Sequence, residues 1–287
     1  MISPQKALKI LRRRSAKGLG QHFLIHQATA EKIAAAIRAE PGDVVVEIGA
    51  GLGALTLPLS KSGAQVIAVE IDAELARFLD NELKKGNGKR VKVECMDILE
   101  LDLVGLHEQF QRKMKIIGNL PYNISSPVLF KLMEAAACLK EAVLMLQDEV
   151  AARVLARPGN KDYGILSVMA TYHGECRRVM RVKPSQFHPP PKVDSQVIHL
   201  RFRDCPLAPQ VEPSWLLQTV KAAFSHRRKT LKNSLLASKL GNVTADLVNS
   251  ALIEASIESR RRPESLTLEE FLRLAQALKR AGTDKTG

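Results

Sequence analysis

The four residues Asn119-Leu120-Pro121-Tyr122 could do chemistry more directly than any other stretch of the sequence. They follow an apolar run at 114–118 that is typical of a buried strand. A polar amide, a proline and an aromatic ring at the end of a strand suit a site that grips a flat base carrying an exocyclic amine. The side-chain carbonyl of Asn119 and the backbone carbonyl of Leu120 would each accept one N–H of that amine. This localises the nitrogen lone pair and aims it at an electrophile.

Pro121 and Tyr122 have properties that suit the same base-binding site. Pro121 fixes its own φ and biases Leu120 away from the helical region, which keeps the Leu120 carbonyl exposed. Tyr122 offers a ring face on which the base can stack. A strand that ends in a proline turn with a buried tyrosine would contain the same residues, so the interpretation depends on the rest of the chain.

A glycine-rich loop, Glu47-Ile-Gly49-Ala-Gly51-Leu-Gly53, lies between a predicted strand and a predicted helix. Glycines there let a ligand approach the backbone closely at a helix N-terminus. Glu70 ends the next predicted strand, where a carboxylate can accept both ribose hydroxyls of a nucleotide. Asp97 follows the third strand and is placed to accept from an exocyclic base amine.

Two cofactors fit this loop, because its Gly-x-Gly-x-x-Ala spacing also satisfies the dinucleotide fingerprint. Three features favour S-adenosylmethionine over a nicotinamide dinucleotide. They are the acid Glu47 two residues before the first glycine, the acid Asp97, and the base-gripping residues after strand four. A nucleotide-dependent oxidoreductase is the alternative at this point, and a titration with both cofactors would separate the two.

Two further clusters are candidates for contacts with the acceptor. The proline-rich stretch at 186–195 predicts a stiff loop in which Phe187 covers the base face opposite Tyr122; a core phenylalanine is the alternative. A phosphate-binding patch is predicted near a helix entry, with a solvated basic face as the alternative. Its residues are Arg227, Arg228, Lys229 and Lys232.

Composition indicates a polyanionic partner. The 287 residues include 43 Lys and Arg against 30 Asp and Glu, giving a net charge of +13 and a pI near 9.7. Such an excess favours nucleic acid. A basic N-terminal segment fits either a phosphate-contacting arm or a free tail; its cations are Lys6, Lys9, Arg12, Arg13 and Arg14. With no signal peptide, membrane span or zinc-type cysteine spacing, we expect a cytoplasmic protein with reduced thiols, no membrane and no metal.

Strand and helix patterns alternate through the first two thirds of the chain, which predicts a mostly parallel sheet covered on both faces. Strands are expected at 43–48, 65–70, 90–95, 114–118, 141–146, 175–183 and 194–203. Helices are expected near 28–39, 53–61, 73–84, 125–137 and 147–156. After a linker at 204–209 the pattern is helical only, at 214–224, 229–238, 244–255 and 267–279. We therefore predict a domain at 1–203 and a small all-helical domain at 204–287.

Five motifs in order carry a resemblance to a known family. They are Gly-Leu-Gly-Gln-His-Phe-Leu, Glu-Ile-Gly-Ala-Gly-Leu-Gly, Asn-Leu-Pro-Tyr-Asn-Ile-Ser-Ser-Pro, Phe-His-Pro-Pro-Pro-Lys-Val-Asp-Ser and Phe-Ser-His-Arg-Arg-Lys-Thr-Leu-Lys-Asn. From about residue 15 to residue 279 the chain resembles the ribosomal RNA adenine N6,N6-dimethyltransferases, most closely their bacterial small-subunit branch.

The resemblance implies a Rossmann-like S-adenosylmethionine-dependent methyltransferase sheet of seven strands with a helical C-terminal RNA- and subunit-binding domain. It implies dimethylation of the N6 atoms of two adjacent adenosines in the 3′-terminal hairpin loop of 16S rRNA, late in small-subunit biogenesis. It places Asn119 at both cofactor and target. The other implied cofactor-binding residues are Gln21, His22, Leu24, Gly49, Gly51, Glu70 and Asp97. His22 and Ala50 depart from the family's frequent Asn and Pro.

Two alternatives share this catalytic core. One is a 23S rRNA adenine methyltransferase of the macrolide-resistance type, against which the Lys-Val-Asp-Ser sequence ending at Ser195 and the Arg-Arg-Lys-Thr-Leu stretch argue. The other is an assembly factor in which catalysis is incidental. Nothing in the sequence demands more than a monomer.

Overall fold

The computed structural model describes residue 7 and residues 21–283, apart from 87, 206, 227, 239 and 241–243. The predicted basic N-terminal segment, the Gly-Leu-Gly before Gln21, and Arg227 lie outside the described residues. The chain divides into two compact units. One comprises Met1–Ala151 with Glu175–Asp204, and the other Ala152–Gly174 with Cys205–Gly287.

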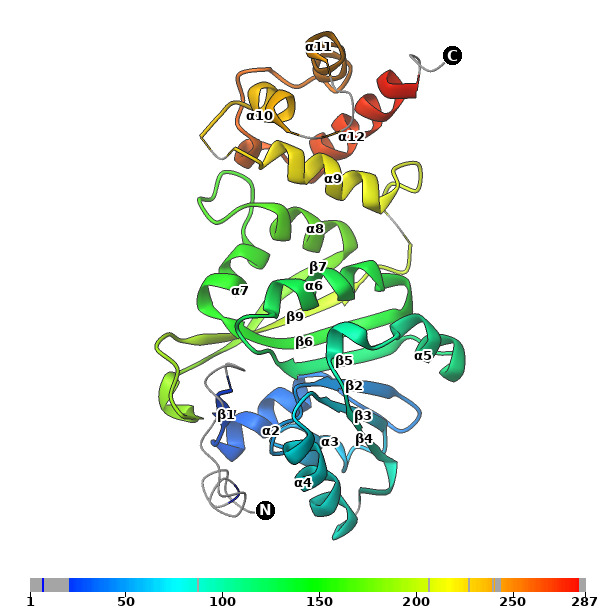
Figure 1. Cartoon of the computed structure of the whole chain (residues 1–287), viewed down its shortest axis with the longest axis vertical. Helices are drawn as coiled ribbons and strands as arrows, with labels where there is room; N and C mark the ends of the chain where they lie inside the picture. The colour runs from blue at the N-terminus through cyan, green and yellow to red at the C-terminus, as the bar shows by residue number, and fades with distance from the viewer. Residues whose placement is uncertain are drawn as a thin grey trace. The chain divides into compact units, whose positions relative to one another are not determined.

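A seven-stranded sheet forms the first unit, in the order β4-β3-β2-β5-β6-β9-β7 (Figure 1). The strands from β4 to β6 pair in parallel, and β9 pairs antiparallel with β6. The predicted sheet of seven mostly parallel strands is therefore confirmed. The strands are β2 (Val44–Ile48), β3 (Gln65–Glu70), β4 (Val91–Cys95), β5 (Met114–Asn119), β6 (Leu139–Gln147), β7 (Gly174–Val182) and β9 (Ser195–Phe202).

Helices follow the strands because parallel neighbours need a crossover. They are α2 (Gln27–Ala36), α3 (Thr56–Leu59), α4 (Ala73–Lys84), α5 (Leu103–Phe110), α6 (Ser125–Glu134) and α7 (Asp148–Leu155), with 3₁₀ turns η2 (Gly88–Arg90), η3 (Ile98–Glu100), η4 (Ala136–Cys138) and η5 (Pro184–Gln186). Side chains of α2 and α3 pack on Val45, Ile117 and Val143 of the sheet. Those of α4 pack on Ala68. These three helices therefore cover one face.

Strand register places three polar residues on that same face. Glu47 pairs with Ala68 on one side and with Ile117 on the other. Side chains two residues apart on a strand share a face. Glu70 and Asn119 therefore project from the same face as Glu47, on three adjacent strands, β3, β2 and β5. Glu70 and Asn119 are the last residues of β3 and β5, and Glu47 is the next-to-last residue of β2.

The opposite end of this face holds a buried lysine. Lys115 Nζ lies 2.8 Å from Asp43 Oδ2 and 3.4 Å from Glu141 Oε1, and it donates to the Arg38 carbonyl at 2.7 Å and the Ile37 carbonyl at 3.2 Å. The lysine thus joins β5 and β6 to the C-terminal end of α2 and to the segment before β2.

A second, two-stranded sheet joins distant parts of the first unit. Its strands are β1 (Phe23–Leu24) and β8 (Phe187–His188), paired antiparallel with Phe23 opposite His188. The Ile25 N–H extends the pairing by donating to the Gln186 carbonyl at 2.8 Å. The segment before α2 is thereby fixed to the loop between β7 and β9.

The second unit is helical. It contains α8 (Ile165–His173), α9 (Pro213–Ala223), α10 (Leu231–Ala237), α11 (Ala245–Glu254), the 3₁₀ turn η6 (Pro263–Ser265) and α12 (Leu268–Thr283). Its core includes Phe271 and Leu274 of α12 and Val248 of α11. The division after residue 204 lies one residue from the predicted boundary, but Ala152–Gly174 groups with the C-terminal helices instead of the sheet. That the two units act as separate domains stays a prediction. No helix in the described ranges combines the length and the apolar character needed to cross a membrane.

Candidate active site

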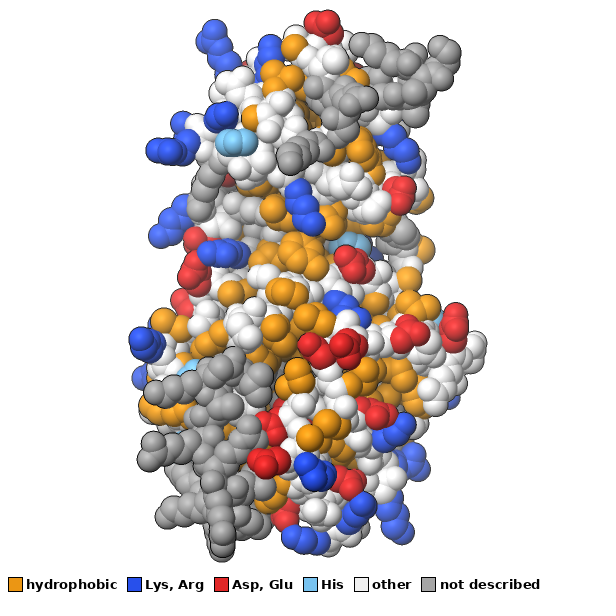
Figure 2. Space-filling view, viewed as in Figure 1, with side chains coloured by type: hydrophobic (Ala, Val, Ile, Leu, Met, Phe, Trp, Pro, Cys, Tyr) orange, Lys and Arg blue, Asp and Glu red, His pale blue; other side chains and the backbone are white. Residues whose placement is uncertain are grey.

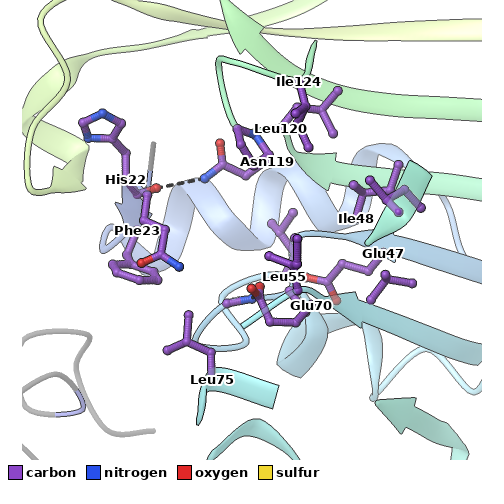
Figure 3. Close-up of a pocket in the computed structure, with 18 of the residues that line it drawn as sticks. His22, Phe23, Glu47, Ile48, Leu55, Glu70, Leu75, Asn119, Leu120 and Ile124 are labelled. Carbon is purple, nitrogen blue, oxygen red and sulfur yellow. Dashed lines mark hydrogen bonds between the residues drawn. The ribbon is translucent and has the colours of Figure 1, made fainter. Parts of the chain in front are cut away.

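A cavity of about 260 Å³ opens at the carboxyl ends of β2, β3 and β5 (Figure 3). In an open parallel sheet, ligands bind at this edge, where the order of the strands reverses. Here the chain runs outward from β2 through β3 to β4 and then crosses back to β5 on the other side of β2. The wall contains predicted site residues from several elements, namely Gln21, His22, Leu24, Gly49, Gly51, Glu70, Asp97, Asn119, Leu120, Pro121 and Tyr122.

The glycine loop after β2 takes a path that requires glycine. Gly49 and Gly53 have φ values of 70° and 82°, in the left-handed region that glycine adopts without steric cost. A Cβ at Gly53 would lie 2.6 Å from Leu79 Cδ1 of α4. The loop therefore lies close against α4, and its backbone forms part of the cavity wall.

Glu70 fixes this loop to the end of β3. Its carboxylate accepts from the Gly51 N–H at 2.8 Å and from the Asp72 N–H at 3.0 Å, and the residue is 5% exposed. Burial raises its pKa, while the two backbone N–H groups oppose the rise. A carboxylate held by two donors still has lone pairs for a ligand's hydroxyl groups.

Glu47 is a second buried acid in the same wall. It is 1% exposed, and its Oε2 has no hydrogen-bond partner among the described residues. Burial raises the pKa of this carboxyl to about 8; Thr56 opposes the rise and the charge of Glu70 adds to it. In Figure 3 the carboxyl group points from β2 toward Glu70 and Leu55.

Asn119 ends β5 with its amide oriented by the backbone of another segment. Its Nδ2 donates to the His22 carbonyl at 3.0 Å, the dashed line in Figure 3. Its Oδ1 is therefore the group that remains to accept from a ligand. The Pro121 carbonyl then accepts from the Ile124 N–H at 3.2 Å and from Ser125 Oγ at 3.0 Å. These bonds turn the chain from β5 into α6.

Two rings lie beside this turn. The centroids of the Tyr122 and His22 rings are 5.3 Å apart, with the planes inclined by 32°. His22 Nδ1 lies 2.7 Å from the Pro189 carbonyl, so Nδ1 carries the hydrogen. The Tyr122 hydroxyl lies 3.1 Å from Ser195 Oγ. Both rings are thus held by the proline-rich loop that sequence reasoning placed near the base.

Phe187 is not part of this wall. It is 3% exposed and packs in the core with Leu24, Ile33 and Val197. In this structure the ring packs in that core, so the expected cover of the base opposite Tyr122 stays a prediction. The ring that lies beside Tyr122 is that of His22.

Asp97 lies at the far side of the cavity, where its carboxylate caps η3 by accepting from the Leu99 N–H at 2.9 Å. Apolar side chains that sequence reasoning missed surround the acids here. Ile71 follows Glu70 and is 52% exposed, and Met96 and Ile98 flank Asp97. A flat apolar ligand would cover them. Their position directly beside the two acids was the available signal.

The predicted phosphate-binding residues belong to the second unit. Arg228 and Lys229 are exposed and Lys232 is half-buried, around the turn that enters α10. Lys and Arg side chains gather beside a histidine in this region of Figure 2. In the described part of the chain, no three His, Cys, Asp or Glu side chains form a group that could hold a metal ion.

Comparisons with known proteins agree on one family of RNA-modifying enzymes. Residues 12–278 match the family described as Ribosomal RNA adenine dimethylase. A protein of Desulforapulum autotrophicum named Ribosomal RNA small subunit methyltransferase A is 42% identical over 97% of each chain. A protein of the same name from Shouchella clausii is 39% identical over 91% of this chain and 89% of its own.

Two solved structures share the fold. A dimethyladenosine transferase from Plasmodium falciparum superposes with a TM-score of 0.78 at 26% identity, covering 91% of this chain and 98% of its own. The 23S rRNA methyltransferase ErmE gives 0.65 at 28% identity, covering 90% and 99%. Both similarities extend over nearly the whole of the chain.

Proposed function

Because the chain belongs to the ribosomal RNA adenine dimethylase family, we propose that the cavity at the ends of β2, β3 and β5 is where it transfers methyl groups to adenosine N6 atoms. The protein is an S-adenosylmethionine-dependent rRNA adenine dimethyltransferase. Its proposed target is the pair of adjacent adenosines in the 3′-terminal hairpin loop of 16S rRNA. The relatives' name, which specifies the small subunit, supports this choice.

One observation carries the assignment of the site. Asn119 and Glu70 project from one face of the sheet into one cavity, with Glu47 on the strand between them. The amide that would hold the acceptor amine and the carboxylate that would hold the donor's ribose thus share a wall. Alignment of the two reactants is the main requirement of a displacement at carbon.

The residues present fit the methyl donor. S-adenosylmethionine supplies a methyl group on a sulfonium sulfur, which is a good leaving group. Glu70 accepts from the ribose hydroxyls, Asp97 from the adenine amine, and the exposed Ile71 covers the adenine. Gly49 and Gly51 bring the backbone close to the ligand, as their positive φ values allow. Gln21, His22 and Leu24 line the methionine end.

The acceptor side is built from the turn after β5. Asn119 Oδ1 and the Leu120 carbonyl accept the two N–H groups of the target amine, and Tyr122 stacks on the base. The target must leave its stack, which costs least in a hairpin loop. Once the nitrogen is alkylated it becomes acidic, and its proton passes to water or to these carbonyls. The reaction therefore needs no general base.

Contacts with the rest of the RNA are assigned to the basic surface. The net charge of +13 supports a polyanionic partner. Arg228 and Lys229 are exposed in the second unit, which suits contacts with RNA phosphates that position the substrate. The substrate is the RNA within the small ribosomal subunit, the compartment is the cytoplasm, and the enzyme acts as a monomer.

The deciding experiment uses small subunits from a strain that lacks this methylation. They are incubated with the protein and S-adenosylmethionine, and dimethyladenosine is quantified by mass spectrometry after digestion of the RNA. Product at the 3′-terminal hairpin is the expected result. Large subunits are the parallel substrate, because the similarity to ErmE makes 23S rRNA the second candidate. Product only there would overturn the small-subunit assignment, and binding without product on either would favour an assembly role.

A further inference from the structure

Among the described residues that line the cavity, Glu47 is the one acid to which the proposed binding scheme gives no role. It lies on β2, between the strand that carries Glu70 and the strand that carries Asn119. It is 1% exposed, lines the cavity, and has an oxygen without a hydrogen-bond partner among the described residues. A buried polar atom without a partner costs free energy, so such an atom at a ligand site indicates a contact made with the ligand.

The two buried glutamates differ in how their charge is stabilised. Glu70 accepts two backbone N–H bonds, which favour its ionised form. Glu47 has hydrogen bonds from Thr56 that favour its ionised form, but its Oε2 has no partner among the described residues and it faces the negative charge of Glu70. The other groups that act on its carboxyl supply no positive charge, since these are the neutral Thr56 of α3 and the acid Glu70. The ring of His22, which also lines the cavity, points away from Glu47 in Figure 3. Burial and the charge of Glu70 outweigh the Thr56 bonds, so Glu47 holds a proton at neutral pH.

The position of Glu47 matches one atom of the donor. In S-adenosylmethionine the sulfonium sulfur lies between the ribose and the transferred methyl group. In the wall, Glu47 lies between Glu70, proposed to hold the ribose, and Asn119, proposed to hold the methyl acceptor. All three side chains are on one face of adjacent strands. A residue in the middle of this row faces the part of the ligand that carries the positive charge.

We propose that Glu47 recognises the charge of the sulfonium: it holds a proton in the free enzyme, gives that proton to solvent when the sulfonium binds, and regains one after the methyl group has left. The inference rests on the proposed function. In the transfer itself, the S–CH₃ bond breaks with its electron pair on sulfur and the N–CH₃ bond forms. The amine releases one proton to solvent, and Glu47 takes one proton from solvent. The wall thus matches the cationic donor while it is bound and the neutral thioether product afterwards.

The test measures protons released on binding, by titration calorimetry in buffers with different heats of ionisation. At pH 6.5 the donor's own ammonium group is still protonated, and so is Glu47, whose pKa is about 8. We expect the wild-type protein to release about one proton with S-adenosylmethionine and almost none with S-adenosylhomocysteine, because only the former brings the sulfonium charge. An analogue with a primary ammonium in place of the methylsulfonium should release a proton as the donor does.

Glu47→Gln is the decisive variant, since glutamine has the shape of the protonated acid and cannot titrate. It should release no proton with either ligand, and its preference for donor over product should fall about tenfold. Glu82→Gln on α4, a half-buried acid that pairs with Lys85 outside the cavity, is the matched control and should behave as wild type. Proton release that persists in Glu47→Gln would overturn the proposal, as would equal release with donor and product.

Two results separate this inference from the proposed function. Dimethylation with no proton release on binding would refute the role of Glu47 and leave the function standing. A protein that binds no S-adenosylmethionine would refute both. If Glu47→Gln fails to fold, the wild-type titrations decide alone: release with the donor must fall as the pH rises from 6.5 through about 8, where the free carboxyl has already ionised.

Discussion

The hydroxyl of Tyr122 lies 3.1 Å from Oγ of Ser195, which joins the turn after β5 to the first residue of β9. Ser195 is 1% exposed, so the serine end of this bond is shielded from water. The ring that is proposed to stack on the target base is therefore held by β9, which lies beyond β6 in the sheet. This explains why the Lys-Val-Asp-Ser and Asn-Leu-Pro-Tyr sequences belong to one site.

Removing the hydrogen bond between Tyr122 and Ser195 should lower methyl transfer less than removing the Tyr122 ring. We expect Tyr122→Phe and Ser195→Ala each to lower transfer modestly, by about 1 kcal/mol for one lost hydrogen bond. Tyr122→Ala also loses stacking, worth about 1–3 kcal/mol per base. Single-turnover rates on small subunits measure both. Equal losses in Tyr122→Phe and Tyr122→Ala would show that the ring does not contact the base.

Asn119→Ala should nearly abolish methyl transfer and leave cofactor affinity mostly intact. The change removes the Oδ1 acceptor of the target amine, and it also removes the bond from Nδ2 to the His22 carbonyl. Asn119→Asp serves as its partner variant, because it keeps an acceptor and loses the donor. Turnover and S-adenosylmethionine affinity are measured on both, and retained turnover in Asn119→Ala would refute the amine-gripping role.

Glu70→Ala should weaken binding of S-adenosylmethionine, with an expected loss of about 1–3 kcal/mol. The change removes the acceptor proposed for the ribose, and it also frees the Gly51 and Asp72 N–H groups that the carboxylate holds. Glu70→Gln keeps one acceptor oxygen, so its affinity for S-adenosylmethionine should lie between those of the wild type and Glu70→Ala. Calorimetric titration gives the affinities, and an unchanged value would remove Glu70 from the ribose site.

Lys115→Met should destabilise the first unit by about 3 kcal/mol, because two carboxylates lose their buried partner. Burial tends to raise the pKa of Asp43 and of Glu141. Hydrogen bonds and charge from Lys115, and from His199 on Glu141, lower both overall. A lowered pKa contributes stability above the ordinary carboxyl range that is lost as the pH falls through the folded-state pKa. Unfolding by denaturant between pH 7 and pH 3 should show this loss in the wild type and a smaller one in Lys115→Met.

Neutralising Arg228 and Lys229 should weaken binding to small subunits and flatten its dependence on salt. Two lost phosphate contacts lower the slope of log K against log salt by about 1.4–1.8. Lys84 and Lys85 on the surface of α4 are the matched control, since their neutralisation removes the same charge from side chains paired with Asp80 and Glu82. An equal change in the control pair would show that only net charge matters.

The sequence predicted the sheet well because its strands are short apolar runs bounded by turns. The strands Val44–Ile48 and Gln65–Glu70 can be predicted without any tertiary information. The helix α8 was missed because Ile165–His173 is apolar on almost all sides, so no amphipathic period marks it. The helix α5 was missed because it is short and contains Gly105, although its capping residue Asp102 was a usable signal.

The parts of the candidate site that lie within sequence motifs could be predicted. The parts that depend on packing between distant segments could not. Glycines and acids at strand ends follow from local pattern, and the predicted Gly49, Glu70 and Asp97 do line one cavity. The packing of Phe187 with Leu24, Ile33 and Val197 brings together distant segments, so no local pattern could predict it. The isolation of the Glu47 carboxyl depends on packing from other strands and a helix, which no local pattern shows.

The chain passes from the first unit to the second at residue 152, returns at 175 and leaves again at 205. A shortened protein ending at residue 204 would keep every strand of the sheet but would expose α8, whose apolar side chains pack with α9 and α12. Such a fragment would tend to aggregate. The methyltransferase half is therefore not separable by one cut, and during synthesis β7 and β9 emerge only after α8, whose helical partners have not yet been made.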